Sequence, residues 1–276
     1  MIKRILVPTD GSDAAMVGVR YAVALARRCG ATLCGLHVVD VKLLEGPFLR
    51  DLSASLGTAP YVNYQGNITL LLEERGRAAL SAFQSVCEEA GAPCETAQAT
   101  GIVAREIVEH SSLADLVVMG RGGEHSAWLE GMLGSTTRSV IRRSSRPVLV
   151  TGVDQLGDQR LLAAYDGSAY ADRALQVAAE LATNWGAALH VLVVGEEVQE
   201  DALAGARQYL QAHGVAGQWE LRPGDPREEI VAYAGACGAD LLIMGAYGHS
   251  KMHELVLGST TNYVIHHAPC PALLTR

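Results

Sequence analysis

The sequence has no long apolar run, no surplus of basic residues and no space for a leader segment. A bilayer span needs roughly 18 consecutive apolar residues, so we expect no membrane insertion. The net charge of −8 repels phosphate backbones and argues against nucleic acid as a main partner. Strand-like residues begin at Ile2, which leaves no space for the apolar core of a signal peptide. We therefore expect a cytoplasmic protein.

The cysteines also form no recognisable pairs. They are scattered without any C-x2-C spacing: Cys29, Cys34, Cys87, Cys94, Cys237 and Cys270. This pattern favours reduced, mostly buried thiols with a structural role. A redox or metal role would require the thiols to cluster in space, which their spacing does not indicate.

Several motifs of catalysis and cofactor binding are absent. No G-x4-G-K-[ST] segment occurs, so the lysine of one large ATPase class is missing. No G-x-S-x-G turn supports a serine nucleophile. A dinucleotide fingerprint fails, because Gly120, Gly122 and Gly123 would need a further glycine where His125 stands. We assign no catalytic residue.

What the chain does have is an internal repeat. Its 276 residues, 49% of them apolar, exceed what one core usually holds and predict two domains. Three segments recur in the same order: ILVPTDGSDAA (5–15) as LLAAYDGSAYA (161–171), LHVVD (36–40) as LHVLV (189–193), and ADLVVMG (114–120) as ADLLIMG (239–245). The polar, Gly-containing segment 151–159 is the best linker, so we predict domains at 1–152 and 153–276.

The first half is longer than the second. Asp10 and Asp166 stand 156 residues apart, but Gly120 and Gly245 only 125 apart, so the first half holds 31 more residues. Most of them lie between Val41 and Leu70. Insertions at the ligand end of a sheet often act as lids, so we expect a partly helical flap near the first site or the domain interface; a disordered or interface loop is the alternative.

The periodicity of each half predicts alternating strands and helices. Strands are expected at 5–7, 32–39, 116–119 and 148–150, all apolar on both faces, as in a parallel sheet covered by helices. Helical spacing covers 14–28, 72–90 and 102–110, and in the second half 171–184, 201–213 and 228–237. The fold class is therefore α/β, with two tandem, doubly wound, Rossmann-like domains of about five parallel strands each.

Pro147 and Pro271 stand at the entrance to each half's last strand, where proline favours an edge position. Exposed edges invite pairing, so we predict that 147–150 and 271–274 pair antiparallel across a domain or subunit interface. The halves would then face one another as a pseudo-dimer. We also expect a homodimer, although one chain already supplies two such edges.

A ligand site is predicted where the strands end. In an open parallel sheet, ligands bind beyond the carboxyl ends of the strands. The D-G-S turns at Asp10 and Asp166 and two glycine loops lie there. The second loop, from Gly245 to Thr261, has the spacing G-x2-G-x9-G-S-T, which lets main-chain N–H groups approach an anion. The alternative for D-G-S is that it only caps the following helix.

The order of P-T-D-G-S, L-H-V-V-D and G-x2-G-x9-G-S-T resembles the universal stress protein family in its tandem two-domain form. The resemblance covers nearly the whole chain except 41–70, and it implies ATP as the ligand, with or without Mg²⁺. By this resemblance, the second site has Asp166 and Val191 at the adenine, Gly245 at the ribose, and Gly248, Gly258, Ser259 and Thr260 at the phosphates. The corresponding first-half residues are Asp10, Val38, Gly120, Gly123, Gly134, Ser135 and Thr136.

Both halves depart from the family pattern. Ten residues rather than nine separate Gly123 from Gly134, so the first loop must bulge. Tyr165 replaces Thr9, and its phenol would either stack on the base or fill the base pocket. We expect the second site to bind ATP more tightly, because phosphate contacts tolerate an insertion less well than an adenine pocket tolerates a new side chain.

Histidines offer a weaker alternative. His249 and His253 are spaced i, i+4 and, with His266 and His267, would ligate a metal if they shared a helix face. We favour no metal site, because the first two belong to the glycine loop and no carboxylate completes the set. The repeat alignment also pairs His37 with His190, which we interpret as structural histidines.

Arginines form one dense basic cluster: Arg138, Arg142, Arg143 and Arg146. Cations near the end of a helix interact favourably with its dipole, which is one explanation. Their counterparts are Asn262, His266, His267 and Cys270. Because a patch needed for phosphate binding should recur in both halves, we interpret the cluster as a surface or interface feature.

Three functions remain open. The first is a cytoplasmic, ATP-binding stress-response or signalling protein with little or no hydrolysis, a slow ATPase at most, whose occupancy changes its interactions with unknown protein partners. The second is an adaptor or scaffold that acts through protein surfaces and dimer edges, with its sites empty or holding another ligand. The third is an enzyme that uses ATP for phosphoryl or adenylyl transfer.

Overall fold

The computed structural model describes residues 2–42, 60–122, 133–153, 155–157, 159–195, 200–248 and 257–276. In the first half the elements are β1 (Arg4–Pro8), α1 (Asp13–Cys29), β2 (Thr32–Asp40), α4 (Pro60–Glu89), β3 (Cys94–Gly101), α5 (Val103–Ser111), β4 (Leu116–Gly120), α6 (Ser135–Arg143) and β5 (Val148–Thr151). The second half has β6 (Arg160–Ala164), α7 (Ala169–Trp185), β7 (Ala188–Val194), α8 (Glu200–Ala212), β8 (Gly217–Arg222), α9 (Pro226–Cys237), β9 (Leu241–Gly245), α10 (Ser259–His267) and β10 (Ala272–Thr275). Strands and helices alternate in both halves, which confirms the predicted α/β class.

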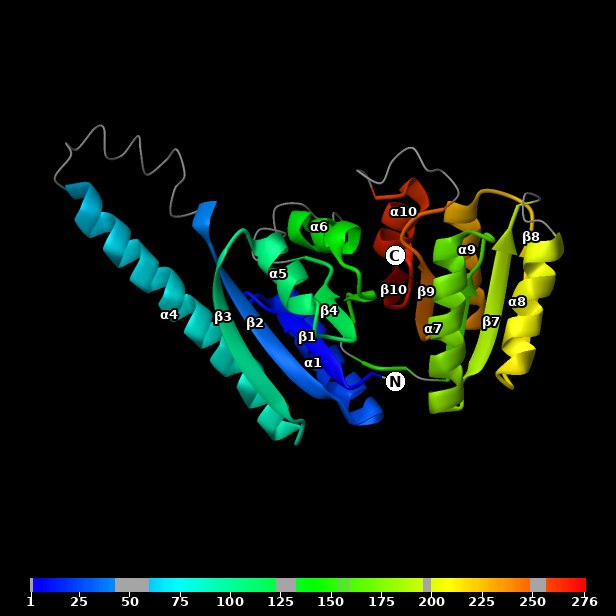
Figure 1. Ribbon diagram of the computed structural model, residues 1–276, viewed down its shortest axis with the longest axis horizontal. Helices are drawn as coiled ribbons and strands as arrows, with labels where there is room; N and C mark the ends of the chain where they lie inside the picture. Colours follow the sequence, from blue (N-terminus) through cyan, green and yellow to red (C-terminus); the bar gives the residue numbers. More distant parts are fainter. Residues whose placement is uncertain are drawn as a thin grey trace.

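The strands form one ten-stranded sheet in the order β3-β2-β1-β4-β5-β10-β9-β6-β7-β8. Each half contributes five parallel strands, as predicted. Their spatial order is the same in both halves. Figure 1 shows the first half on the left and the second on the right, with the chain's carboxyl end between them. The two predicted sheets are therefore present, but they are joined edge to edge.

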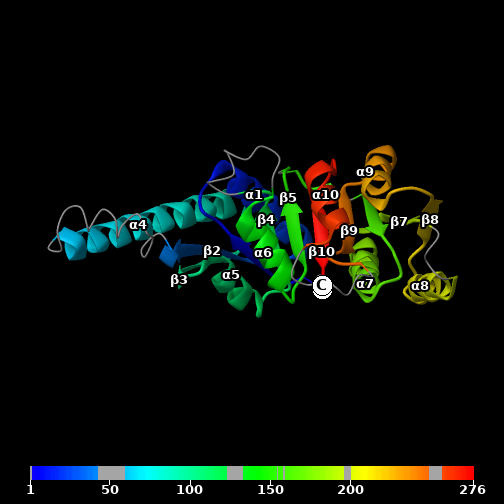
Figure 2. The same ribbon diagram turned by 90° about the horizontal axis from the view of Figure 1, so that it is seen from above.

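The junction between the halves is the antiparallel pair β5–β10. Val150 pairs with Ala272, Leu149 with Leu273, and Val148 with Leu274. Both strands lie in the middle of the long molecule (Figure 2). This confirms the predicted antiparallel pairing of the Pro-flanked strands and identifies it as an interface within one chain. The pairing satisfies the main-chain groups that two open edges would otherwise expose.

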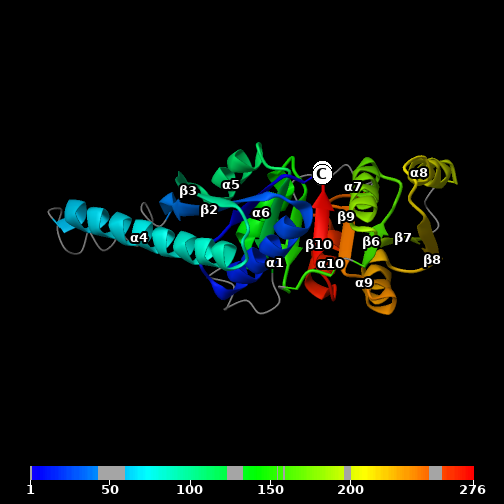
Figure 3. The ribbon, with the colours of Figure 1, turned by 90° about the horizontal axis from the view of Figure 1, so that it is seen from below.

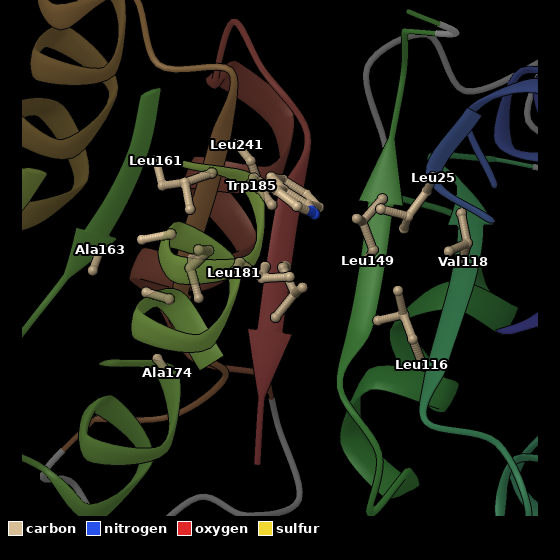
Figure 4. Close-up of a cluster of buried hydrophobic side chains, with 14 of the residues drawn as sticks. Leu25, Leu116, Val118, Leu149, Leu161, Ala163, Ala174, Leu181, Trp185 and Leu241 are labelled. Atoms are coloured by element: carbon tan, nitrogen blue, oxygen red, sulfur yellow. The ribbon is translucent and has the colours of Figure 1, made fainter. Parts of the chain in front are cut away.

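Helices cover both faces of the sheet. On one face, α1, α4, α7 and α8 pack on a cluster that contains Phe83, Leu149 and Trp185. On the other face, α5, α6, α9 and α10 pack on a second cluster, to which Val150 and Leu274 belong. Figure 4 shows that the first cluster runs across the junction, from α7 and β6 to β5 and β4. Both faces of the strands are therefore buried, which explains their apolar runs without polar alternation.

Two outer strands gave little sequence signal. β3 and β8 form the edges of the sheet, and their residues are mostly exposed or half-buried. Polar residues suit such edges because they discourage pairing with other chains. Among the described residues, no helix is long and apolar enough to cross a membrane.

The insertion of the first half is only partly described. Residues 43–59 lie outside the described residues, and the remainder of 41–70 includes the first turns of α4. α4 extends past the outer edge of the first half, away from the junction (Figure 3). The described part is helical, as expected, but it does not lie at the domain interface. Farther along α4, Ala79 packs against Gly11, so this helix covers the first D-G-S turn.

Candidate functional site

A cavity of about 780 Å³ opens at the carboxyl ends of β6, β7 and β9 in the second half. α9 and α10 form its other walls. Of the residues predicted for the second site, Asp166, Gly245, Gly248, Gly258, Ser259 and Thr260 line this cavity. Val191 does not. The sheet end therefore brings the turn and the glycine loop together, as parallel topology requires.

The D-G-S turn positions Asp166 at the cavity. Gly167 has φ of 76°, a left-handed conformation that favours glycine. Ser168 caps α7, accepting a hydrogen bond from the Ala171 N–H at 3.2 Å, while Asp166 Oδ1 accepts from the Ser168 N–H at 3.0 Å. A carbon added at Gly248 would lie 2.8 Å from Asp166 Oδ2. Ser168, not Asp166, is thus the helix cap, and the carboxylate lies beside the glycine loop.

The glycines of the loop have different reasons to be glycine. A side chain at Gly245 would lie 2.8 Å from Tyr170 Cβ, so this glycine lets α7 pack closely on β9. At Gly258 an added carbon would meet nothing closer than 3.4 Å, an ordinary contact. Its φ of −52° and ψ of 140° are open to any residue. Neither conformation nor packing in the unliganded chain requires Gly258, which instead leaves space at the cavity wall.

The amino end of α10 faces this space without a side-chain cap. Gly258 is the N-cap residue and supplies no hydrogen-bonding side chain, and Ser259 and Thr260 follow in the first turn. The first N–H groups of a helix lack intrahelical partners and carry its positive dipole end. Thr261, which the sequence analysis missed, donates its hydroxyl to the Ala246 carbonyl at 3.1 Å and so fixes α10 to the end of β9. The arrangement suits an anion.

Val191 lies on the wrong face of the sheet to line the cavity. It belongs to the cluster under α7 and α8, whereas its neighbour Leu192 and the strand's last residue, Val194, line the cavity. The repeat alignment of this strand was wrong by three residues. The Thr9 N–H donates to the Leu36 carbonyl, and the Tyr165 N–H to the Leu192 carbonyl, so Leu36 corresponds to Leu192.

This corrected register changes two further pairings. Val38 now corresponds to Val194. His37 and His190 are not equivalent: His37 Nδ1 lies 3.0 Å from the Thr9 carbonyl oxygen, and His190 Nδ1 lies 3.0 Å from the Tyr233 hydroxyl. Each ring has a local partner, which agrees with a structural role. The signal that reveals the register is the constant offset of 156 residues from Asp10–Asp166 through Ala31–Ala187.

Tyr165 directs its ring away from a base-stacking position. The residue is only 4% exposed and belongs to the cluster on the far face. Its hydroxyl donates to Asp172 Oδ1 at 2.8 Å, and its ring meets Trp219 edge-on. Burial and the Asp172 hydrogen bond raise the pKa of Tyr165. Tyr165 is one of the residues that line the cavity, but Asp172 and Trp219 hold its phenol in the core cluster.

The first half repeats much of this arrangement. Gly11 has φ of 78°, Ser12 caps α1, and Asp10 Oδ1 accepts from the Ser12 N–H at 3.0 Å. The remaining predicted residues occupy matching positions: Val38 near the end of β2, Gly120 at the end of β4, Gly134 as N-cap of α6, and Ser135 and Thr136 in its first turn. Gly123 lies outside the described residues.

Metal binding finds no support among the described residues. They contain no group of three or more His, Cys, Asp or Glu side chains that could hold an ion. His249 and His253 lie outside them. His266, from the second half, accepts a hydrogen bond at Nε2 from the Leu133 N–H of the first half at 3.2 Å. This bond joins α10 of the second half to the residue before Gly134 in the first half.

The cysteines are free thiols. Cys87 and Cys94 lie in contact, which the sequence spacing did not indicate. Burial, and secondarily Cys94, raises the pKa of Cys87 to about 12. A thiol with this pKa stays protonated at neutral pH and is a weak nucleophile.

The arginine cluster does not act as one patch. Arg146 Nη2 donates to the Ser112 carbonyl at 2.7 Å, within the first half. The Arg142 carbonyl accepts from Arg276 Nη1 at 2.8 Å, across the junction. Arg138, on α6 of the first half, lines the cavity of the second half. The predicted interface role therefore holds for part of the cluster, but one member also reaches the candidate site.

Comparisons with known proteins agree on one family. The sequence model of the universal stress protein family matches residues 1–152, 159–207 and 193–276. A universal stress protein of Synechocystis sp. is 30% identical over 287 aligned positions, covering 100% of both chains. One from Mycobacterium tuberculosis is 26% identical and covers 99% of this chain and 96% of its own.

Solved structures show the same architecture over the whole chain. The crystal structure of a universal stress protein from Archaeoglobus fulgidus superimposes with a TM-score of 0.78 at 25% identity, covering 99% of this chain and 98% of that one. The tandem α/β fold is thus shared along its full length.

Proposed function

The chain belongs to the universal stress protein family, and from this premise we propose that its second half binds ATP. The observation that carries the proposal is the grouping of three features around one cavity. These are the Asp166 carboxylate, the open wall at Gly258 and the uncapped amino end of α10. Together they offer an acceptor for a nucleoside and donors for phosphates.

The size and lining of the cavity support a nucleotide. Small-molecule sites usually measure about 300–1,000 Å³, and this cavity measures about 780 Å³. Leu192, Val194, Ile230 and Met244 give it an apolar side that suits a flat base. Asp166 would accept hydrogen bonds from the nucleoside, and Gly248, Gly258, Ser259 and Thr260 would hold the phosphates, with or without Mg²⁺.

We propose binding without efficient turnover. Asp166 is the one carboxylate among the described residues that line the cavity. If it holds the nucleoside, no lining carboxylate remains to activate water at the phosphates. The protein would then be a cytoplasmic stress-response or signalling protein whose occupancy changes its interactions with other proteins, and at most a slow ATPase.

Homodimerisation needs a surface other than the Pro-flanked strands, because these pair with each other within the chain. The outer strands β3 and β8 are the remaining sheet edges.

We propose 1–152 and 153–276 as the two domains. The fragment 153–276 has lost β5 as the partner of β10, so it should self-associate in sedimentation experiments. A folded, monomeric fragment would contradict this role of the edge.

Nucleotide binding is tested on the purified full-length protein. Denaturation should release ATP or ADP, which mass spectrometry identifies. Calorimetry on the nucleotide-free protein should then show ATP binding, and Asp166→Asn should weaken it. Asp172→Asn is the matched control, because Asp172 bonds Tyr165 on the far face. Absence of any nucleotide binding would favour the adaptor. Rapid ATP turnover would instead favour a transferase or hydrolase.

A further inference from the structure

Arg138 lines a cavity that belongs to the other half of the chain. It is the fourth residue of α6, in the first half, whereas the other described lining residues come from the second half. α6 and α10 lie on the same face of the sheet, on either side of the β5–β10 junction. The junction therefore brings a cation to a site that its own half does not supply.

The region around Arg138 is held firmly across the junction. Arg121 Nη2 donates to the Ala268 carbonyl at 2.9 Å, and Arg276 Nη1 donates to the Arg142 carbonyl at 2.8 Å. The Leu133 N–H donates to His266 at 3.2 Å. These bonds join the segments that flank α6 and α10, so they fix where α6, and with it the backbone of Arg138, lies relative to the cavity.

The helix dipole does not explain Arg138. Arg142 and Arg143 lie in the last turn of α6, where a cation is favourable. Arg138 follows directly after the first turn, nearer the positive end. Its contact with the Leu133 carbonyl, at 3.5 Å, is at the limit of a hydrogen bond, and no carboxylate of the described residues pairs with it. A guanidinium with five donors is thus available to an anion in the cavity.

The repeat does not supply the same cation to the first half. The residue that corresponds to Arg138 on α10 is Asn262. Asn262 also lines the second-half cavity. An amide carries no net charge, so α10 has no cation at the position that Arg138 holds on α6. In a chain of net charge −8, a cation at the cavity would favour an anionic ligand there.

We propose that Arg138 binds the terminal phosphates of the nucleotide in the second-half cavity, so that this site is completed by both halves and prefers nucleoside triphosphates over uncharged nucleosides. The inference rests on the proposed nucleotide binding at that cavity. A guanidinium suits the task because its planar donors match phosphate oxygens in pairs. Bound nucleotide would also strengthen the junction, since it would contact α6 and α10 together.

The test compares three probes, ATP, ADP and adenosine, by calorimetry on the full-length chain. Arg138→Gln should weaken ATP binding about tenfold to a hundredfold, ADP binding less, and adenosine binding not at all. Arg143→Gln is the control, because it removes an equal charge from the same helix without lining the cavity. Arg138→Lys should restore part of the ATP affinity, because it keeps the charge but not the paired donors.

A double variant identifies the site on which Arg138 acts. In a Gly258→Val background the residual ATP binding belongs to the first half, so adding Arg138→Gln should change it no further. If wild type binds ATP and Arg138→Gln binds it equally well, the inference is wrong and the proposed function stands. Equal losses of ATP and adenosine would show a structural role and also overturn the inference. If wild type binds none of the probes, the proposed function itself fails.

Discussion

In the second half, Gly248 and Gly258 are separated by nine residues and Arg138 reaches the cavity beside them. In the first half, ten residues separate the corresponding glycines, and Asn262 stands in the place of Arg138. The helix over the first D-G-S turn is also different, because α4 has 30 residues and its counterpart α8 has 13. The scaffold of strands and caps is the same in both halves. The two candidate sites differ in the length of the glycine loop, in the residue at the position of Arg138, and in the helix next to the D-G-S turn.

The largest expected difference between the halves is in ATP affinity after substitution of the N-cap glycines. Gly258→Val places branched carbons where phosphates would approach the α10 amino end, and should weaken binding by at least about a hundredfold, through loss of two charge-assisted hydrogen bonds. Gly134→Val should cost less, because the first loop is one residue longer and presents its donors differently.

The structure has space for an added Cβ at both N-cap glycines. At Gly258 and at Gly134 an added Cβ would lie no closer than 3.4 Å to other atoms. Calorimetry measures the two affinities, and thermal melting without ligand checks the fold. Equal losses of affinity would contradict the asymmetry, and unchanged binding in both variants would favour the adaptor.

The next effect concerns Gly120 and Gly245, at the ends of β4 and β9. A side chain at either position should lower stability, but by a different amount in each half. A side chain at Gly120 would fall 2.1 Å from the Ala14 carbonyl oxygen, and at Gly245 2.8 Å from Tyr170 Cβ. Gly120→Ala and Gly245→Ala should each lower the free energy of unfolding by about 1–3 kcal/mol, because α1 and α7 must move off the sheet. The loss should be greater for Gly120→Ala.

Urea unfolding measures both changes, and Gly258→Ala is the control, with an expected change within about 0.5 kcal/mol. A stability loss in Gly258→Ala as large as in Gly245→Ala would show that packing, not ligand space, accounts for the loop glycine. The comparison then separates glycines that the fold needs from those that a ligand needs.

Much of the fold could be predicted from the sequence, because the repeat shows the pattern of most strands and helices twice. The turns at Asp10 and Asp166 and the loop glycines follow from local chemistry, in which φ and side-chain size restrict the residue. The register of β7 was predicted wrongly because the sequence L-H-V occurs in both β2 and β7, but at different distances from the start of the strand. Continuing the offset of β1 and β6 without a gap would have found Val194.

Contacts across the junction could not be predicted. The place of Arg138 depends on the angle and register at which β5 meets β10, and neither leaves a local pattern in α6. Its absence from the repeat even argued against a phosphate role, since a site was assumed to lie within one half. A site built by two halves need not repeat its residues.

The smallest expected effect is a pH dependence that His266 gives to the first half. Burial, the neighbouring His267, and then Arg121 and Arg138 lower the pKa of His266, so the folded state favours the neutral ring that accepts the Leu133 N–H. Unfolded His266 takes up a proton near its ordinary pKa of about 6.5. As the pH falls through that value towards the lower folded pKa, the unfolded state binds more protons and stability decreases.

Because the ring is partly exposed, the loss should stay below about 1 kcal/mol. Denaturant unfolding at several pH values from 8 to 5 measures it in wild type and in His266→Gln, whose amide can still accept the Leu133 N–H. The variant should lose less stability on acidification. His190, whose pKa burial also lowers, is present in both proteins and cancels in the difference. As the pH is lowered, the nucleotide affinity of the first half should decrease in wild type but not in His266→Gln. Protonated His266 can no longer accept the Leu133 N–H, so the segment next to Gly134 loses this bond. Superimposable pH profiles for the two proteins would show that His266 does not control the first half.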